Sequence, residues 1–176
     1  HTLDVDGRRV RTGSVAELPA GPITAAAASG DQTVVVVDHR AYVVPLSLDG
    51  PATGIGPAVE VYPSHRAGRA WLLTYPADGS VVARELGLDG VEATSAAVLS
   101  GSATVRGAAG EGVVIDRLGA DGTRSLAAWD PARPGEPPAT FRTDALFVAA
   151  SRNVVASRPS GCSAQQCDLF LDEPTS

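Results

Sequence analysis

The most chemically mixed segment of the chain lies between positions 62 and 71. Its five notable residues are Tyr62, His65, Arg66, Arg69 and Trp71. Aromatic and arginine side chains are enriched at the contact hot spots of proteins. The single histidine lacks the partners that a zinc site needs, and the sequence contains no Gly-x-Ser-x-Gly nucleophile elbow. We therefore predict that this segment forms a binding surface, and we assign no catalytic residue to it.

Two pairs of acidic residues could also do chemistry. Asp168 and Asp172 stand four residues apart on one face of an expected strand and resemble a glycosidase pair, although nothing in the sequence places them in a cleft. Asp4 and Asp6 precede a glycine as in the opening of a calcium loop, but arginines follow where further oxygen ligands belong. We interpret the latter pair as a hairpin turn, and we expect no metal ion and no cofactor.

The elements that must position these residues follow a repeat in which an apolar residue precedes aspartate. The pairs are Val5-Asp6, Leu48-Asp49, Leu88-Asp89, Trp129-Asp130 and Leu171-Asp172, at intervals of 43, 40, 41 and 42 residues. Short strand-like runs separated by glycine and proline fill each interval, and helix-forming runs are scarce. A period near 40 in an all-strand pattern predicts a β-propeller blade. A β-sandwich, the alternative, gives no reason for such a period.

Aligning the chain on these pairs predicts four antiparallel meanders of about four strands each. The units span 21–58, 59–101, 102–143 and 144–176 and form a single domain over 1–176. The first strands, at 23–29, 59–64, 103–109 and 145–150, are mostly rich in small residues, as the crowded axis of a propeller requires. The last unit ends before a fourth strand, and we expect residues 2–17 to complete it, with 9–15 pairing with 168–172. A fragment of a propeller with six or seven blades remains the alternative.

Composition limits the class of partner. The net charge is −6 and the pI is about 4.9, with the arginines scattered along the chain. Nucleic-acid-binding proteins usually carry a basic stripe and a high pI, so we expect no nucleic acid as partner. No apolar run approaches the roughly 18 residues of a membrane span, so we expect no direct membrane insertion.

The two cysteines, Cys162 and Cys167, are separated by four residues. A metal site would need two more cysteine or histidine ligands nearby, and a redox pair would have Cys-x-x-Cys spacing within a βαβ unit. We favour a disulfide that pins a short loop or hairpin, as is usual in an oxidising compartment. A disulfide favours an extracytoplasmic protein, secreted or anchored at the cell surface as a lipoprotein. The chain starts at His1 rather than at methionine, and we interpret His1 either as the first residue after a removed signal peptide or membrane anchor or as a vector remnant.

The Trp129-Asp130 pair resembles the end of a WD-type repeat, and the neighbouring pairs resemble the same position with leucine in place of tryptophan. The chain lacks the Gly-His pair of such repeats, the Gly-Gly pair of kelch repeats and the Asp-box of sialidases. It is therefore similar to divergent bacterial β-propeller proteins of the cell envelope or exterior. The resemblance implies a fold and no active site.

From this we expect a non-catalytic extracytoplasmic propeller that binds a protein, a peptide or a cell-envelope ligand on a face of the ring, where loops gather. One alternative is a carbohydrate-active enzyme of the glycoside hydrolase or lyase type at the propeller mouth. Two carboxylates about 5 to 9.5 Å apart in a pocket would support it. A second alternative is the sensor or scaffold domain of a membrane-anchored protein.

Overall fold

The computed structural model of the chain describes residues 3–5, 8–10, 18–29, 32–45, 51–89, 96–101, 103–151, 153–162 and 167–174. Every helix or strand assigned within these ranges is a β-strand. Accordingly, none of the described residues belongs to a helix long and apolar enough to cross a membrane. The valine content and the many turn residues of the sequence explain this preference for short strands.

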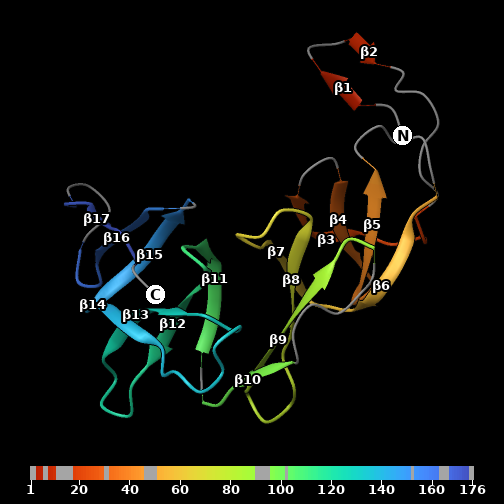
Figure 1. The fold of residues 1–176 in the computed structure, drawn as a ribbon. Coiled ribbons are helices and arrows are strands. Elements are labelled where there is room, and N and C mark those ends of the chain that lie inside the picture. The colour runs from red at the N-terminus through yellow and green to blue at the C-terminus, as the bar shows by residue number, and fades with distance from the viewer. Residues whose placement is uncertain are drawn as a thin grey trace.

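Four sheets follow one another along the chain, each a simple antiparallel meander (Figure 1). Blade 1 contains β3 (Ile23–Ser29), β4 (Gln32–Val37), β5 (Arg40–Pro45) and β6 (Thr53–Pro57). Blade 2 contains β7 (Glu60–Pro63), β8 (Arg69–Thr74), β9 (Val81–Gly87) and β10 (Ala97–Leu99). Blade 3 contains β11 (Ala103–Ala109), β12 (Gly112–Leu118), β13 (Arg124–Trp129) and β14 (Ala139–Thr143). Blade 4 contains β15 (Ala145–Ala150), β16 (Val155–Pro159) and β17 (Phe170–Asp172).

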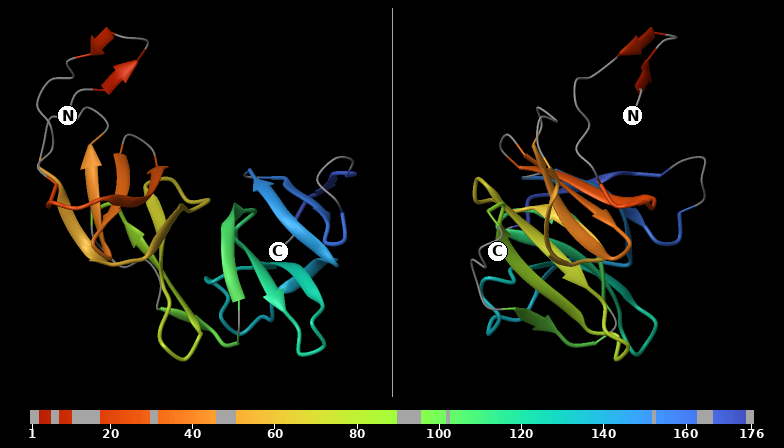
Figure 2. Two further views of the ribbon diagram at one scale, coloured as in Figure 1. Left: turned by 180° about the vertical axis from the view of Figure 1, so that it is seen from behind. Right: turned by 90° about the vertical axis from the view of Figure 1, so that its right-hand side faces the viewer.

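The first strand of each sheet lies innermost. β3 contacts β7, β7 contacts β11, and β11 contacts β15, while the later strands of each sheet lie progressively farther out (Figures 1 and 2). Sheets that radiate from a common axis in this way form a four-bladed β-propeller, not the two stacked layers of a sandwich. The all-β propeller architecture predicted from the 40-residue period is confirmed.

Three apolar clusters join consecutive blades. Val34, Val36 and Leu72 belong to the cluster between blades 1 and 2. Trp71, Ile115 and Trp129 belong to the larger cluster between blades 2 and 3. A smaller cluster, which includes Ala109, Val114, Val155 and Phe147, joins blades 3 and 4. The core is therefore divided among the seams between blades, because each sheet is only one layer thick and must cover both of its faces.

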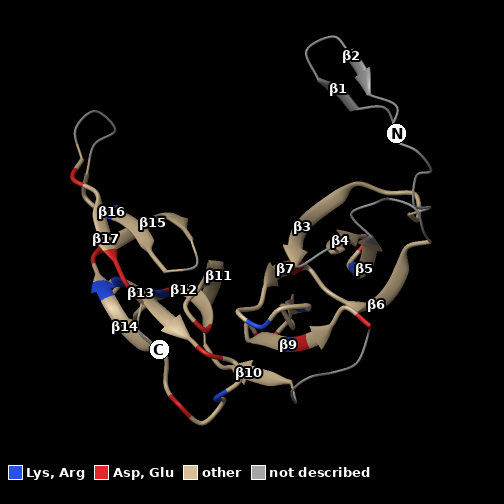
Figure 3. Cartoon of the chain, turned by 45° about the horizontal axis from the view of Figure 1, so that its top comes forward, with Lys and Arg blue, Asp and Glu red and all other residues tan. Residues whose placement is uncertain are grey.

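Blades 4 and 1 are not joined by such a cluster among the described residues. In two views the sheets form an arc whose first and last members stand apart (Figures 1 and 3). The exposed fractions of Val148 and Leu171 are 47% and 71%. Leu171 pairs with Ala156, one position out of phase with Val155, which is buried against blade 3. Side chains alternate between the faces of a strand, so Leu171 lies on the face of blade 4 that is turned away from blade 3.

The N-terminal residues form a small hairpin of their own. β1 (Leu3–Val5) pairs with β2 (Arg8–Val10) as a hairpin requires, and the predicted turn itself, Asp6 and Gly7, lies outside the described residues. In Figures 1 and 2 this hairpin lies apart from the four blades. Most of the strand expected to complete blade 4 falls on residues 11–17, which lie outside the described residues. Among the described strands, β17 pairs with β16.

Tight turns connect β8 to β9 in blade 2 and β12 to β13 in blade 3. Gly79 and Gly122 have φ values of 79° and 82°, which glycine adopts without steric cost. The preceding aspartates accept hydrogen bonds from the backbone of the residues two positions on, Ser80 and Thr123. Each of these turns contains an Asp-Gly pair, which is typical of tight hairpins.

The aspartates of the repeat have different roles. Asp130 accepts a hydrogen bond of 2.9 Å from the Ala132 backbone N–H, as expected for a turn residue. Asp172 instead forms an ion pair with Arg142, whose guanidinium also stacks over the ring of Phe170 at 4.5 Å from its centroid. This pair connects blades 3 and 4 and raises the pKa of Arg142 above its ordinary value, chiefly through the hydrogen bond to Asp172. Leu48, Asp49 and Asp6 lie outside the described residues.

Candidate functional site at the axial mouth

A cavity of about 620 Å³ opens at one end of the propeller axis. Its lining comes from the C-terminal ends of all four innermost strands and from the turns that follow them. The lining residues are Ala28, Ser29, Tyr62, Pro63, Ser64, His65, Ala67, Gly107, Ala108, Ala109, Gly110, Ala150 and Ser151. We call this cavity the axial mouth. Its volume lies within the range of about 300–1,000 Å³ that is typical of ligand pockets.

Small side chains make the mouth possible. Gly107 allows β11 to pass close to β15, since a Cβ added to it would lie 3.3 Å from the Cβ of Ala150 and 3.5 Å from Cζ of Phe147. Ala108 and Ala150 line the cavity, as the predicted crowding of small residues around the axis anticipates. Ala25 and Ala27 instead pack against the cluster between blades 1 and 2. The sequence signal for the mouth was thus present, but it indicated only steric crowding and no binding site.

The described lining carries no aspartate, glutamate or arginine. Its polar side chains are hydroxyls, one imidazole and one phenol: Ser29, Ser64, Ser151, His65 and Tyr62. Groups of this kind form hydrogen bonds without a fixed charge. The mouth therefore suits a ligand that is uncharged where it enters.

Tyr62 of β7 contributes its ring to the mouth and points its hydroxyl into the seam between blades 2 and 3. That hydroxyl donates to Oε2 of Glu60 at 3.0 Å, and the Tyr75 hydroxyl donates to the same oxygen at 2.8 Å. Burial, followed by the Glu60 carboxylate, raises the pKa of both phenols far above the ordinary value. Both tyrosines therefore remain neutral hydrogen-bond donors, and Tyr62 has no role as a base.

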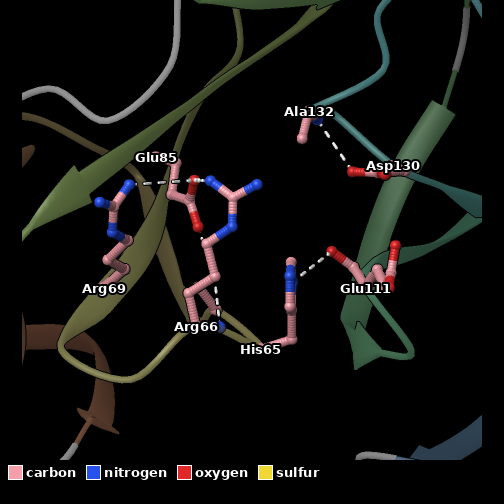
Figure 4. Close-up of polar contacts among 8 residues, drawn as sticks. His65, Arg66, Arg69, Glu85, Glu111, Asp130 and Ala132 are labelled. Carbon is pink, nitrogen blue, oxygen red and sulfur yellow. Dashed lines mark hydrogen bonds and ion pairs between the residues drawn. The ribbon is translucent and has the colours of Figure 1, made fainter.

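His65 lies in the β7–β8 turn and reaches across to blade 3. Its Nδ1 is 3.0 Å from the backbone carbonyl oxygen of Glu111 (Figure 4). A carbonyl oxygen only accepts, so Nδ1 carries the proton, and in the neutral ring Nε2 is left as an acceptor. Glu111 in turn forms an ion pair with Arg133 at 3.0 Å. The predicted binding residue His65 therefore lies at the mouth and also bridges two blades.

Arg66 and Arg69 belong to a charge cluster around a buried carboxylate. Glu85 is fully buried and accepts hydrogen bonds from Ser64 Oγ and, at 3.1 Å, from Arg66 Nη1. Arg69 Nη1 lies 3.8 Å from the same carboxylate, and Figure 4 shows the two guanidiniums on either side of Glu85. Both arginines remain more than a third exposed. Their first role is to neutralise Glu85, beside the mouth rather than within its lining.

Trp71, predicted to belong to the binding surface, lies in the core instead. Only 1% of it is exposed, in the cluster between blades 2 and 3. It pairs across the sheet with Tyr62 and Glu85, so all three side chains leave the sheet on the face toward blade 3. β8 is the second strand of its blade and both of its faces are covered, which places an indole there in the core. Of the five predicted residues, Tyr62 and His65 line the mouth.

The other candidates lie elsewhere. Both oxygens of Asp172 are held by Arg142 in the outer part of blade 4, and neither Asp168 nor Asp172 lines the mouth. The described residues contain no group of three or more histidine, cysteine, aspartate or glutamate side chains arranged to hold a metal ion. Cys162 and Cys167 form the predicted disulfide in the connection between β16 and β17, with their Cα atoms 5.8 Å apart.

No protein-family model matches the chain, and no curated protein matches its sequence. Among solved structures, the chain is similar to the crystal structure of the computationally designed Ika4 protein. The two share 17% sequence identity with a TM-score of 0.52, over 92% of this chain and 97% of that chain. At this identity the similarity concerns the fold alone.

Proposed function

We propose that the chain is a non-catalytic binding domain that takes a segment of a protein or peptide ligand at the axial mouth. The observation that carries the proposal is the composition of the mouth: four blades together line one cavity with small and uncharged side chains. Such a lining offers shape and hydrogen bonds. Its described part contains no carboxylate or guanidinium, and its one imidazole, that of His65, is held at Nδ1 by the backbone carbonyl of Glu111.

The alternative of sugar hydrolysis has less support. A glycosidase of the usual kind needs two carboxyl groups about 5 to 9.5 Å apart on either side of the bond that breaks. The described lining of the mouth contains none, and Asp172 is engaged by Arg142. An Ala- and Gly-rich lining instead favours a ligand held by close fit.

A location outside the cytoplasm is part of the proposal. The disulfide between Cys162 and Cys167 supports it, because disulfides persist mainly in oxidising compartments. The Trp129-Asp130 strand end resembles that of WD-type repeats, and the proposal includes a divergent bacterial envelope protein with WD-like blades. The relevant partners are then proteins, peptides or cell-envelope components.

A matched pair of variants tests the proposal. Ala67 and Ala77 are both exposed alanines in turns of blade 2, and of the two only Ala67 lines the mouth. A displayed library of random dodecapeptides is selected on the unmodified protein, and enriched peptides are then titrated against Ala67→Trp and Ala77→Trp by fluorescence anisotropy. The indole at position 67 fills the mouth, so we expect Ala67→Trp to weaken binding at least about tenfold and Ala77→Trp to change it less than about twofold. Equal binding to both variants, or no enrichment at all, would contradict the proposal.

A further inference from the structure

We propose that the axial mouth binds its ligand as an added β-strand along the inner edge of β3, and that the ligand is an extended, uncharged peptide segment with small apolar side chains. The inference rests on the proposed binding function and specifies how the ligand is held. Strand addition to a free sheet edge is a general mode of peptide recognition, in which main-chain hydrogen bonds supply affinity.

The inner edge of β3 has free main-chain groups. Among the described strands, β3 is at the edge of its sheet and pairs only with β4. Ser29 and Gln32 are partners across a two-residue loop, which makes them a hydrogen-bonded pair. In an antiparallel ladder the pairs alternate, so Ala28 and Ala26 are in non-hydrogen-bonded pairs. Their N–H and C=O groups therefore point away from β4, toward the axis.

The other innermost strands are less suitable. β7 has only four residues, and its corresponding edge position is Pro63, which has no N–H. β11 is interrupted by a register shift between Val105 and Gly107, and β15 by one between Phe147 and Ala149. The register shift of β3 lies at its far end, between Ile23 and Ala25, so the five residues nearest the mouth pair regularly. Regular pairing is what an added strand needs in order to match its partner over several residues.

The open side of the ring provides room for that strand. Ala26 and Ala28 are exposed, in contrast to the half-buried Ala25 and Ala27, which face blade 2. On the other side of the axis, β15 exposes Val148 and Ala149. No core cluster of the described residues fills the seam between blades 4 and 1. A strand placed here would pair with β3 and bury apolar surface on both blades.

The same surfaces define the chemistry of the occupant. Neither β3 nor β15 contains a charged residue, and both ribbons are tan in Figure 3. A charged side chain entering here would lose water without gaining a partner. Alanines present a flat wall, which leaves space for valine- or alanine-sized side chains and hydrogen-bond partners for the backbone.

A synthetic heptapeptide, Ac-Ser-Val-Ala-Val-Ala-Val-Ser-NH2, is the probe. Two derivatives carry N-methyl groups on the three valines or on the two alanines. In an extended strand these two sets of N–H groups point to opposite edges, and only one edge can pair with β3. We expect isothermal titration calorimetry to show binding of the parent and of one derivative, with the other weakened at least about tenfold.

Variants of the protein locate the pairing edge. Ala28→Pro removes one free N–H from β3 without removing a ladder bond to β4, and an outward-facing edge position tolerates proline. Ala108→Pro makes the corresponding change on β11, where Ala108 is one position from the closing pair Ala109–Gly112. We expect Ala28→Pro to weaken binding of the parent peptide by about five- to tenfold and Ala108→Pro to change it less than about twofold. Unchanged thermal unfolding midpoints establish that both variants are folded.

Equal affinity of the two N-methylated derivatives overturns the inference, and this comparison needs no protein variant. Equal sensitivity to Ala28→Pro and Ala108→Pro also overturns it. If the parent binds and Ala67→Trp blocks it in either of these cases, the proposed binding function still holds and only strand addition is wrong. A concentration-dependent dimer that Ala28→Pro abolishes would replace the peptide with a second copy of the chain. Absence of binding by the heptapeptide refutes the ligand class, whereas the random library judges the binding function separately.

Discussion

The seam between blades 2 and 3 and the seam between blades 4 and 1 both lie between neighbouring sheets of a propeller, but their side chains fill the two seams to different extents. Blades 2 and 3 bury two tryptophans, with Trp71 at 1% and Trp129 at 3% exposure, and add polar contacts across the seam from Tyr75 and His65. Blades 4 and 1 leave Val148 and Leu171 exposed. The same 40-residue repeat thus supports a packed seam in one place and an accessible surface in another.

The size of the side chains and the face on which they leave the sheet explain the difference. Trp129 of blade 3 and Leu171 of blade 4 both precede the repeat aspartate, but Trp129 faces blade 2, whereas Leu171 lies on the face of blade 4 that is turned away from blade 3. A large side chain in the inner part of a blade can reach the next sheet, about 10 Å away. β3 has four alanines among its seven residues, and β15 exposes Val148 and Ala149, so neither strand places a large side chain in the seam between blades 4 and 1. The accessible surface that we assign to ligand binding is therefore a consequence of small residues at strand positions that the repeat leaves free.

The largest loss of stability should follow a substitution in the packed seam between blades 2 and 3. Replacing Trp129 with alanine removes a side chain that is 3% exposed and leaves a cavity. We expect the free energy of unfolding to fall by about 3–5 kcal/mol. Leu171→Ala, in the corresponding repeat position of blade 4, should change it by less than about 0.5 kcal/mol, because 71% of that residue is exposed. Urea unfolding followed by tryptophan fluorescence and circular dichroism measures both, and similar losses would mean that Leu171 is packed as Trp129 is.

A smaller effect should come from the charge cluster of the packed seam. Glu85→Gln leaves Arg66 and Arg69 without their carboxylate, and we expect a loss of about 1–3 kcal/mol in the free energy of unfolding. The loss is limited because both guanidiniums are partly exposed and can recruit water. Glu111→Gln removes an exposed ion pair with Arg133 and should cost about 0–1 kcal/mol. If the two substitutions cost the same in urea unfolding, the burial of Glu85 does not contribute to this seam.

The smallest expected effect on stability comes from the turns between the second and third strands, which differ between blades 2 and 3 on the one hand and blade 4 on the other. Hydrogen bonds from Ser80 and Thr123 lower the pKa of Asp78 and Asp121 below the ordinary aspartate value. A lowered folded-state pKa means that these turns contribute stability above about pH 4, lost as pH falls through the lowered pKa. The disulfide that closes the corresponding connection in blade 4 does not titrate.

The measurement is a ¹³C NMR titration of the aspartate carboxyl groups. The midpoints of Asp78 and Asp121 should both lie below the ordinary value. Ser80→Ala should raise the midpoint of Asp78 and leave that of Asp121 in place, because the Ser80 hydroxyl bond is the main cause of the Asp78 shift. Coincident midpoints of Asp78 before and after the substitution would exclude that cause.

Much of the fold could be predicted from particular residues. The repeat pairs around Leu88 and Trp129 aligned the strands correctly, and the Asp-Gly pairs located two hairpin turns with their positive φ values. The segment predicted as a binding surface is divided between two environments. Tyr62 and His65 lie at the mouth, whereas Trp71 is in the core, because strand alternation and neighbouring sheets decide which face of β8 is buried.

The sequence by itself determined the local structure: a period near 40, short valine-rich strands, tight turns and a cysteine pair close enough for a disulfide. These features depend on residues near one another in the chain, so a single sequence contains them. Tertiary structure decided that the ends of four distant strands line one cavity and that Glu85 is buried between Arg66 and Arg69. It also decided that the described residues fill the seam between blades 2 and 3 with a core cluster and form none between blades 4 and 1. Those outcomes depend on how sheets separated by 40 or more residues fit together, and the fit is set by the summed volumes of side chains across each seam rather than by any one segment.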